Sequence, residues 1–227
     1  MHTTHKDLVK TARITGIMYL MMAIGGILGF MTFHKQIYVA NDPTETLTNL
    51  TEKETLARVR LIFEFVIIVS QALTAVWFYK LFKQFSDWGA WALGIWGTVN
   101  AVAIMVSAIS MGAALGVAHD SLLPYEDKVM LVELLGLLIR HAWLVGSLFF
   151  GLWLIPMGYI VLSESLMPAW LGRILIIGGV GYVLSAFLKY MGLSDSLLDI
   201  LVIPASIGEF WMIGYLLIFG IREKNIN

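Results

Sequence analysis

Long runs of apolar residues, each about twenty residues in length and with few or no ionisable side chains, constrain this chain more than any other feature. A soluble domain buries its apolar side chains through shorter amphipathic segments that keep a polar face. A helix of about 20 apolar residues matches instead the roughly 30 Å hydrocarbon core of a bilayer. The composition agrees, because 59% of the residues are hydrophobic and only 14% are charged. We therefore expect an integral membrane protein.

The apolar runs predict an all-α fold, a six-helix transmembrane bundle that forms a single domain over residues 1–227. Residues 129–161 are apolar for too long to be one straight span, since at about 1.5 Å per residue they would reach roughly 50 Å. We assign residues 129–139 to a short outer-surface or re-entrant helix before span four. The six predicted spans are residues 14–33, 56–81, 88–117, 141–162, 170–190 and 200–221.

The polar segment between the first two spans carries two helix-start signals. Asp42 followed by Pro43 resembles a helix N-cap with proline at the first helical position. Thr51 and Glu54 have the spacing of a capping box that would open span two. Four histidines outside the predicted helices are interpreted as loop or terminal residues without a metal role, namely His2, His5, His34 and His119.

Charge and cysteine content exclude several classes of function. The formal net charge is -1, so the chain offers no basic surface for nucleic acid. The absence of cysteine excludes disulfides, thiolate metal sites and cysteine nucleophiles. We expect the lipid bilayer as a partner, with a small polar solute or ion as ligand, and no cofactor.

Basic residues near the span ends predict the orientation, because cytoplasmic loops retain an excess of Lys and Arg. One face of a six-span topology collects Lys6, Lys10, Arg13, Lys80, Lys83, Arg173, Arg222 and Lys224. The opposite face collects Lys35, Lys53, Lys128 and Lys189. Both termini are therefore predicted to be cytoplasmic.

Ionisable residues inside the predicted spans are the functional candidates, since such groups are costly in a bilayer unless they face a bundle interior or water. Glu64 and Glu209 lie at similar heights when residues are counted from the inner span ends. Arg60, Arg140 and His141 lie nearer the outer face, so we expect an outward-facing polar cavity with the two carboxylates deepest. The candidate ligand- or proton-binding residues are Arg60, Glu64, Gln71, Asn100, Arg140, His141, Ser206 and Glu209.

Three interpretations of this cluster stay open. The first is transport or binding of a proton, cation or small polar solute in the cavity. The second is a metal-dependent intramembrane hydrolase, in which Glu64, His141 and Glu209 hold a divalent metal. The third is a structural or accessory membrane protein without a site, in which Arg60 neutralises Glu64 and Glu209 is hydrogen-bonded or protonated. No sequence motif of a known reaction class favours the second.

Four segments together resemble one family across nearly the whole chain. They are Ala12-Arg-Ile-Thr-Gly-Ile-Met-Tyr-Leu20, Ser147-Leu-Phe-Phe-Gly-Leu-Trp-Leu-Ile-Pro-Met-Gly-Tyr159, Leu166-Met-Pro-Ala-Trp-Leu-Gly172 and Val202-Ile-Pro-Ala-Ser-Ile-Gly-Glu209. In their order and spacing they resemble the bacterial multi-pass membrane family catalogued as domain of unknown function 4386. The resemblance implies the fold and a location in the inner (cytoplasmic) membrane, and it implies no activity.

Overall fold

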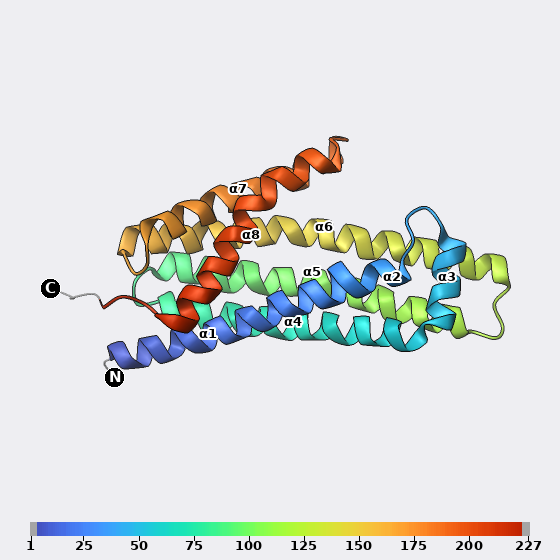
Figure 1. Cartoon of the computed structure of the whole chain (residues 1–227), viewed down its shortest axis with the longest axis horizontal. Helices are drawn as coiled ribbons and strands as arrows, with labels where there is room; N and C mark the ends of the chain where they lie inside the picture. The colour runs from blue at the N-terminus through green and yellow to red at the C-terminus, as the bar shows by residue number, and fades with distance from the viewer. Residues whose placement is uncertain (1–3, 224–227) are drawn as a thin grey trace. The chain divides into compact units, whose positions relative to one another are not determined.

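The computed structural model describes residues 4–223, and the elements found there are helices (Figure 1). Six of the helices in this described part are long and apolar enough to cross a membrane. Large apolar side chains point outward along them, for example Ile109 and Ile218, which are 69% and 65% exposed. Because water does not tolerate so much exposed apolar surface, the chain is a multi-pass membrane protein. The elements are α1 (His5–Gly25), the π-helix η1 (Gly26–His34), α2 (Lys35–Ile37), α3 (Pro43–Glu52), α4 (Glu54–Phe82), α5 (Asp87–His119), α6 (Tyr125–Glu164), α7 (Ala169–Tyr190) and α8 (Asp195–Ile218).

The all-α, six-span prediction is confirmed, and most helices are longer than their predicted spans. The first membrane-crossing stretch covers His5–Ile37 and consists of α1, η1 and α2. The apolar run marks the part of a helix that crosses hydrocarbon, whereas backbone hydrogen bonding continues into the polar flanks. His5, His34 and His119 consequently belong to helices and not to loops, and His2 lies outside the described residues.

The separate outer-surface or re-entrant helix predicted at residues 129–139 is wrong. These residues are the first part of α6, a continuous helix of 40 residues that continues into the predicted span four. At about 1.5 Å per residue, α6 is roughly 60 Å long and exceeds the hydrocarbon core. Val132 and Ile139 are apolar because they are buried against other helices of the protein, at 1% and 0% exposed.

The N-cap prediction is confirmed, and the capping-box prediction is wrong. The Asp42 carboxylate accepts a 2.8 Å hydrogen bond from the Glu45 backbone N–H, and Pro43 opens α3. Thr51 lies near the end of α3, where its hydroxyl donates to the Leu47 carbonyl at 2.7 Å. Thr51 therefore belongs to the last turn of α3 and does not cap α4.

The chain divides into two compact units, each of which is described by itself. Unit 1 comprises Met1–Leu20, Ser70–Asn100 and Val145–Asn227, and unit 2 comprises Met21–Val69 and Ala101–Leu144. The prediction of one domain over residues 1–227 stays a prediction.

In unit 1, glycines bring α7 and α8 into backbone contact. A Cβ atom at Gly178 would lie 2.3 Å from the Ala205 backbone nitrogen, and one at Gly181 would lie 2.0 Å from the Leu201 carbonyl oxygen. Only a residue without a side chain fits such spacing, as is common where membrane helices pack tightly. Helix α8 ends at Ile218, and Gly220, with φ +73°, follows the C-cap residue Phe219. A left-handed glycine at this place terminates the helix, which is why span six stops earlier than its apolar run predicts.

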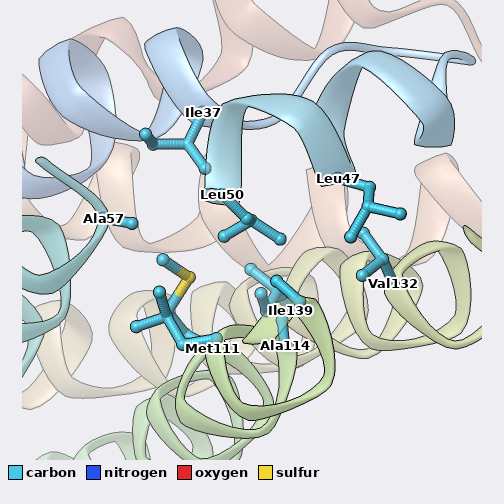
Figure 2. Packing of buried hydrophobic residues seen from close by; sticks show 10 residues of the cluster. Ile37, Leu47, Leu50, Ala57, Met111, Ala114, Val132 and Ile139 are labelled. Carbon is cyan, nitrogen blue, oxygen red and sulfur yellow. The ribbon is translucent and has the colours of Figure 1, made fainter. Parts of the chain in front are cut away.

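In unit 2, α3 covers an apolar cluster that Figure 2 shows from close by. Leu50 of α3 lies between Ile37, Ala57 and Met111, and its side chain is completely buried (Figure 2). Helix α3 therefore covers the cluster with apolar side chains, and its N-cap helps to stabilise the helix in this position.

The π-helix η1 packs against α4 through two glycines. A Cβ atom at Gly25, the last residue of α1, would lie 2.9 Å from Ile67, and one at Gly29 would lie 2.8 Å from Phe63. The four-residue spacing puts both glycines on one face and allows the close approach. Nine consecutive residues of π-helix are unusual, because π-helix occurs mostly as single turns and often near functional sites.

Candidate functional site

The Arg60–Glu64 pair of α4 lies in unit 2 and is almost completely buried. The two side chains are 1% and 2% exposed, and the Arg60 guanidinium donates to both carboxylate oxygens of Glu64. The Ser107 hydroxyl also donates to Glu64. The Trp143 indole N–H lies 3.2 Å from the same carboxylate and 3.1 Å from the Ser107 hydroxyl oxygen. Glu64 is thus neutralised by one cation and supplied with further donors.

This network leaves Glu64 little capacity for a ligand. A buried carboxylate with a paired cation and several donors is a stable structural group, and breaking the pair is costly. The stripe that joins Arg60 to Glu64 was visible in the sequence. Trp143 was not, because its apolar neighbours on α6 give no periodic signal for a hydrogen-bonding role.

Glu209 lies in unit 1 and has a different environment. The Tyr19 hydroxyl donates a 2.6 Å hydrogen bond to the Glu209 carboxylate. Among residues 4–223, no basic side chain forms an ion pair with Glu209. Glu209 is therefore a carboxyl group on a membrane-crossing helix that has no ion-pair partner in the described part of the chain.

Aromatic rings hold Tyr19 in position. Its ring packs edge-on against Phe78 and Trp153, with centroids 5.8 Å and 5.5 Å apart, and it is 1% exposed. Edge-to-face packing fixes the direction in which the hydroxyl points. Sequence reasoning missed Tyr19 as a functional residue, although a tyrosine in the middle of an apolar run was a usable signal.

Gln71 and Asn100 lie at one level of unit 1. Helices α4 and α5 are joined by residues 83–86 and run antiparallel, and a Cβ at Gly97 would lie 2.8 Å from both Ala75 and Trp153. Gln71 lies one turn before Ala75 on α4, and Asn100 lies about one turn after Gly97 on α5. Because the two helices are antiparallel, both steps lead in the same direction, so Gln71 and Asn100 lie at one level.

The amides at this level lack hydrogen-bond partners. The buried atoms Gln71 Oε1, Asn100 Oδ1 and Asn100 Nδ2 have none within the described part of the chain. Leaving such an atom unpaired costs roughly 1–3 kcal/mol, so each one calls for an explanation by an ion, water or function. Tyr19, Trp153 and Glu209 contact one another in series, and Gln71 and Asn100 lie within one turn of Ala75 and Gly97 beside Trp153.

Three further predicted site residues are exposed, unlike the buried Arg60–Glu64 pair. Arg140 and His141 of unit 2 have exposed side chains, and Arg140 lines a surface cavity. Ser206 of unit 1 is exposed on α8 although it lies one turn from Glu209. Glu64 and Glu209 belong to different units, so the single cavity predicted around both stays a prediction.

Metal-binding side chains do not gather in the part of the chain that the structure describes. No group of three or more His, Asp and Glu residues is arranged there to hold a metal ion. These residues therefore provide no set of metal ligands for the hydrolase interpretation.

Comparisons with known proteins bear on the family. A segment of 48 residues is 35% identical to a protein of Archaeoglobus fulgidus described as an uncharacterized protein, and it covers 21% of this chain and 30% of that protein. The match thus spans less than a third of the relative. No solved structure matches the chain. A family model described as domain of unknown function (DUF4386) matches residues 14–220. The chain belongs to this family of membrane proteins.

Proposed function

We propose that this protein moves a small polar solute or cation across the membrane and that Glu209 is its proton- or cation-binding group. The observation that carries the proposal is the Glu209 carboxyl group, which has no ion-pair partner in the described part of the chain and is hydrogen-bonded to Tyr19 within a membrane-crossing helix. Glu64 differs from Glu209 in this respect, because Arg60 already neutralises the Glu64 carboxylate.

The Tyr19 hydroxyl suits a group that changes its charge. A phenol donates to an ionised carboxylate and accepts from a protonated one, so the contact persists in both states. Glu209 therefore gains or loses a proton without breaking an ion pair. Chains of protonatable side chains inside membrane spans commonly serve proton relays in this way.

The unpaired amide atoms support a place for the solute. Gln71 and Asn100 offer both donors and acceptors beside Trp153, whose ring contacts Tyr19. A polar solute, or water accompanying a cation, would satisfy the atoms that lack partners. We assign the solute to this level of unit 1.

The proposal includes a location. The excess of Lys and Arg on one face of the six-span topology supports cytoplasmic termini, and the family resemblance supports the bacterial inner membrane. The alternative is an accessory role without a binding site. Glu64, whose carboxylate is already paired with Arg60, fits that alternative better than Glu209 does.

Infrared spectroscopy of the purified protein tests proton binding directly. The wild type is expected to show a carboxyl C=O band that disappears as the pH rises, and Glu209→Gln is expected to lack it. Tyr19→Phe should keep the band at a shifted frequency, because it removes a hydrogen bond to the carboxyl group. Glu126→Gln is the matched control, since it makes the same chemical change at an exposed side chain.

Transport is tested in liposomes loaded with a pH-sensitive dye under sodium or potassium gradients. Wild-type protein is expected to move protons across the membrane in exchange for the cation. The proton flux in Glu209→Gln is expected to fall to the rate of protein-free liposomes. Unchanged proton flux in Glu209→Gln, or a titrating band that survives in it, would rule out the proposal.

A further inference from the structure

Three aromatic rings form a ladder along η1 and its continuation in unit 2. Phe30 and His34 stack with centroids 4.6 Å apart and an interplanar angle of 10°, and His34 stacks on Tyr38 at 4.8 Å and 20°. Phe30 and His34 belong to η1, and Tyr38 follows the end of α2 with an extended backbone. The Phe30 end of the ladder packs against Trp143, with centroids 4.3 Å apart.

The ladder forms one wall of a cavity of about 280 Å³ within unit 2. The start of α3 forms a second wall, and α6 forms a third with Val132, Gly136 and Leu137. At Gly136 the backbone of α6 lies against the Tyr38 ring, because a Cβ there would be 3.1 Å from Tyr38 Cε1. The volume and the aromatic lining are close to those of small-molecule sites in proteins.

Two polar atoms of the ladder have no partner. His34 Nδ1 and the Tyr38 hydroxyl are buried and lack a hydrogen bond among the described residues. Burial raises the pKa of the Tyr38 hydroxyl well above its usual range, so this group stays protonated and able to donate. His34 Nδ1 donates in one neutral tautomer. Both residues line the cavity, so a ligand there would lie beside the two rings.

The charges that line the cavity do not favour an ionic ligand. Asp42 and Glu133 are acidic and Arg140 is basic, so the lining has no excess of positive charge for an anion. The Asp42 carboxylate already accepts from the Glu45 backbone, and Glu133 and Arg140 are exposed to the surroundings. A flat, uncharged ring with acceptor oxygens matches the aromatic wall and the two unpaired groups.

We propose that the cavity lined by Phe30, His34, Tyr38 and Arg140 binds a planar, uncharged ring that carries carbonyl oxygens, the chemistry of a quinone headgroup. The ring stacks or packs edge-on against the ladder. One carbonyl oxygen accepts from the Tyr38 hydroxyl and the other from His34 Nδ1. This site belongs to unit 2 and is independent of the function proposed for Glu209.

Tryptophan fluorescence of the full-length protein provides the test, because Trp143 contacts Phe30. The probes are tetramethylbenzoquinone, which has no tail, and decylubiquinone, which has a membrane-soluble tail. The variants are Tyr38→Phe and His34→Phe, which keep a ring at each position of the ladder. Tyr125→Phe is the matched control, since this tyrosine of unit 2 is 59% exposed.

We expect saturable quenching in the wild type. The affinity for the probe should be about tenfold weaker in Tyr38→Phe and in His34→Phe, and unchanged in Tyr125→Phe. A tenfold loss of affinity corresponds to the loss of about one hydrogen bond. Stronger binding of the tailed probe would identify the membrane as the source of the ligand, and equal binding would identify the headgroup alone as what is recognised.

Thermal melting with and without each probe gives a second readout for any variant that is poorly stable, since a bound ligand raises Tm. Quenching that never saturates, or equal affinity in all four proteins together with equal Tm shifts, would overturn the proposal.

Discussion

Arg60 and Glu64 lie one helix turn apart on α4 and form an almost completely buried ion pair, with 1% and 2% of the side chains exposed. Removing one partner leaves a buried charge without compensation, which costs roughly 3–5 kcal/mol. We expect Arg60→Gln and Glu64→Gln each to lower the free energy of unfolding by an amount in that range. Reversible unfolding of the purified protein in detergent measures both losses.

The double substitution separates pairing from other effects. Because it removes both charges, we expect Arg60→Gln with Glu64→Gln to cost less than the sum of the two single losses. Arg58→Gln is the control, since Arg58 pairs with Glu54 at an exposed position and such pairs contribute at most about 1 kcal/mol. Strictly additive losses would contradict the pairing.

The hydroxyl of Ser107 makes a second, smaller contribution to the same network. Ser107→Ala removes a donor from the Glu64 carboxylate and is expected to cost about 1–3 kcal/mol. Ser110→Ala is the matched control one turn later on α5, where the hydroxyl donates only to the Val106 carbonyl of its own helix. Equal stability losses in the two variants would argue against a specific role for Ser107.

The contact between α7 and α8 depends on the absence of a side chain at Gly181. In Gly181→Ala the new Cβ would meet the Leu201 carbonyl oxygen, a backbone atom that cannot turn aside, so the helices must separate. Overpacking of this kind costs typically about 1–3 kcal/mol. We expect a lower Tm for this variant in thermal melting.

Gly214→Ala is expected to change Tm in the opposite direction. Nothing lies within 4 Å of a Cβ at this position of α8, and alanine favours a helix over glycine by about 1 kcal/mol. We expect a small rise in Tm. If both glycine variants shifted Tm in the same direction, the close approach at Gly181 would not be the cause.

The N-cap of α3 is a local stabiliser whose loss should be seen in hydrogen exchange. Asp42→Ala removes the acceptor for the Glu45 N–H and is expected to cost about 0.5–2 kcal/mol. Amides of α3 should exchange faster, because Leu47 and Leu50 are then held less firmly over the apolar cluster. Thr48→Ala, which changes an exposed residue of the same helix, should leave the exchange rates nearly unchanged.

The number and type of the long helices followed from the sequence because hydrocarbon thickness acts on every span alike. A run of about twenty apolar residues has one stable conformation in a bilayer, whatever its neighbours are. The continuation of α6 through residues 129–139 did not follow. Hydropathy shows that residues such as Val132 avoid water, and it does not tell whether lipid or α3 covers them.

The candidate site was predicted in part. Arg60 and Glu64 share a helix, so their spacing alone revealed the pair. Tyr19 and Glu209 are 190 residues apart, and a single sequence carries no signal for a contact between side chains so distant along the chain. Trp143 escaped notice for the same reason, since its partner Glu64 lies on another helix.

The π-helix from Gly26 to His34 changes how related chains should be compared with this one. Each π hydrogen bond encloses one residue more than an α hydrogen bond, so the faces of α1 cannot be extended across η1 by the α-helical period. A relative that lacks one residue in this segment would lose the extra residue and still present the same side chains before and after it. We therefore expect family members to differ in length within residues 26–34, where an alignment without a gap would mispair the side chains of η1.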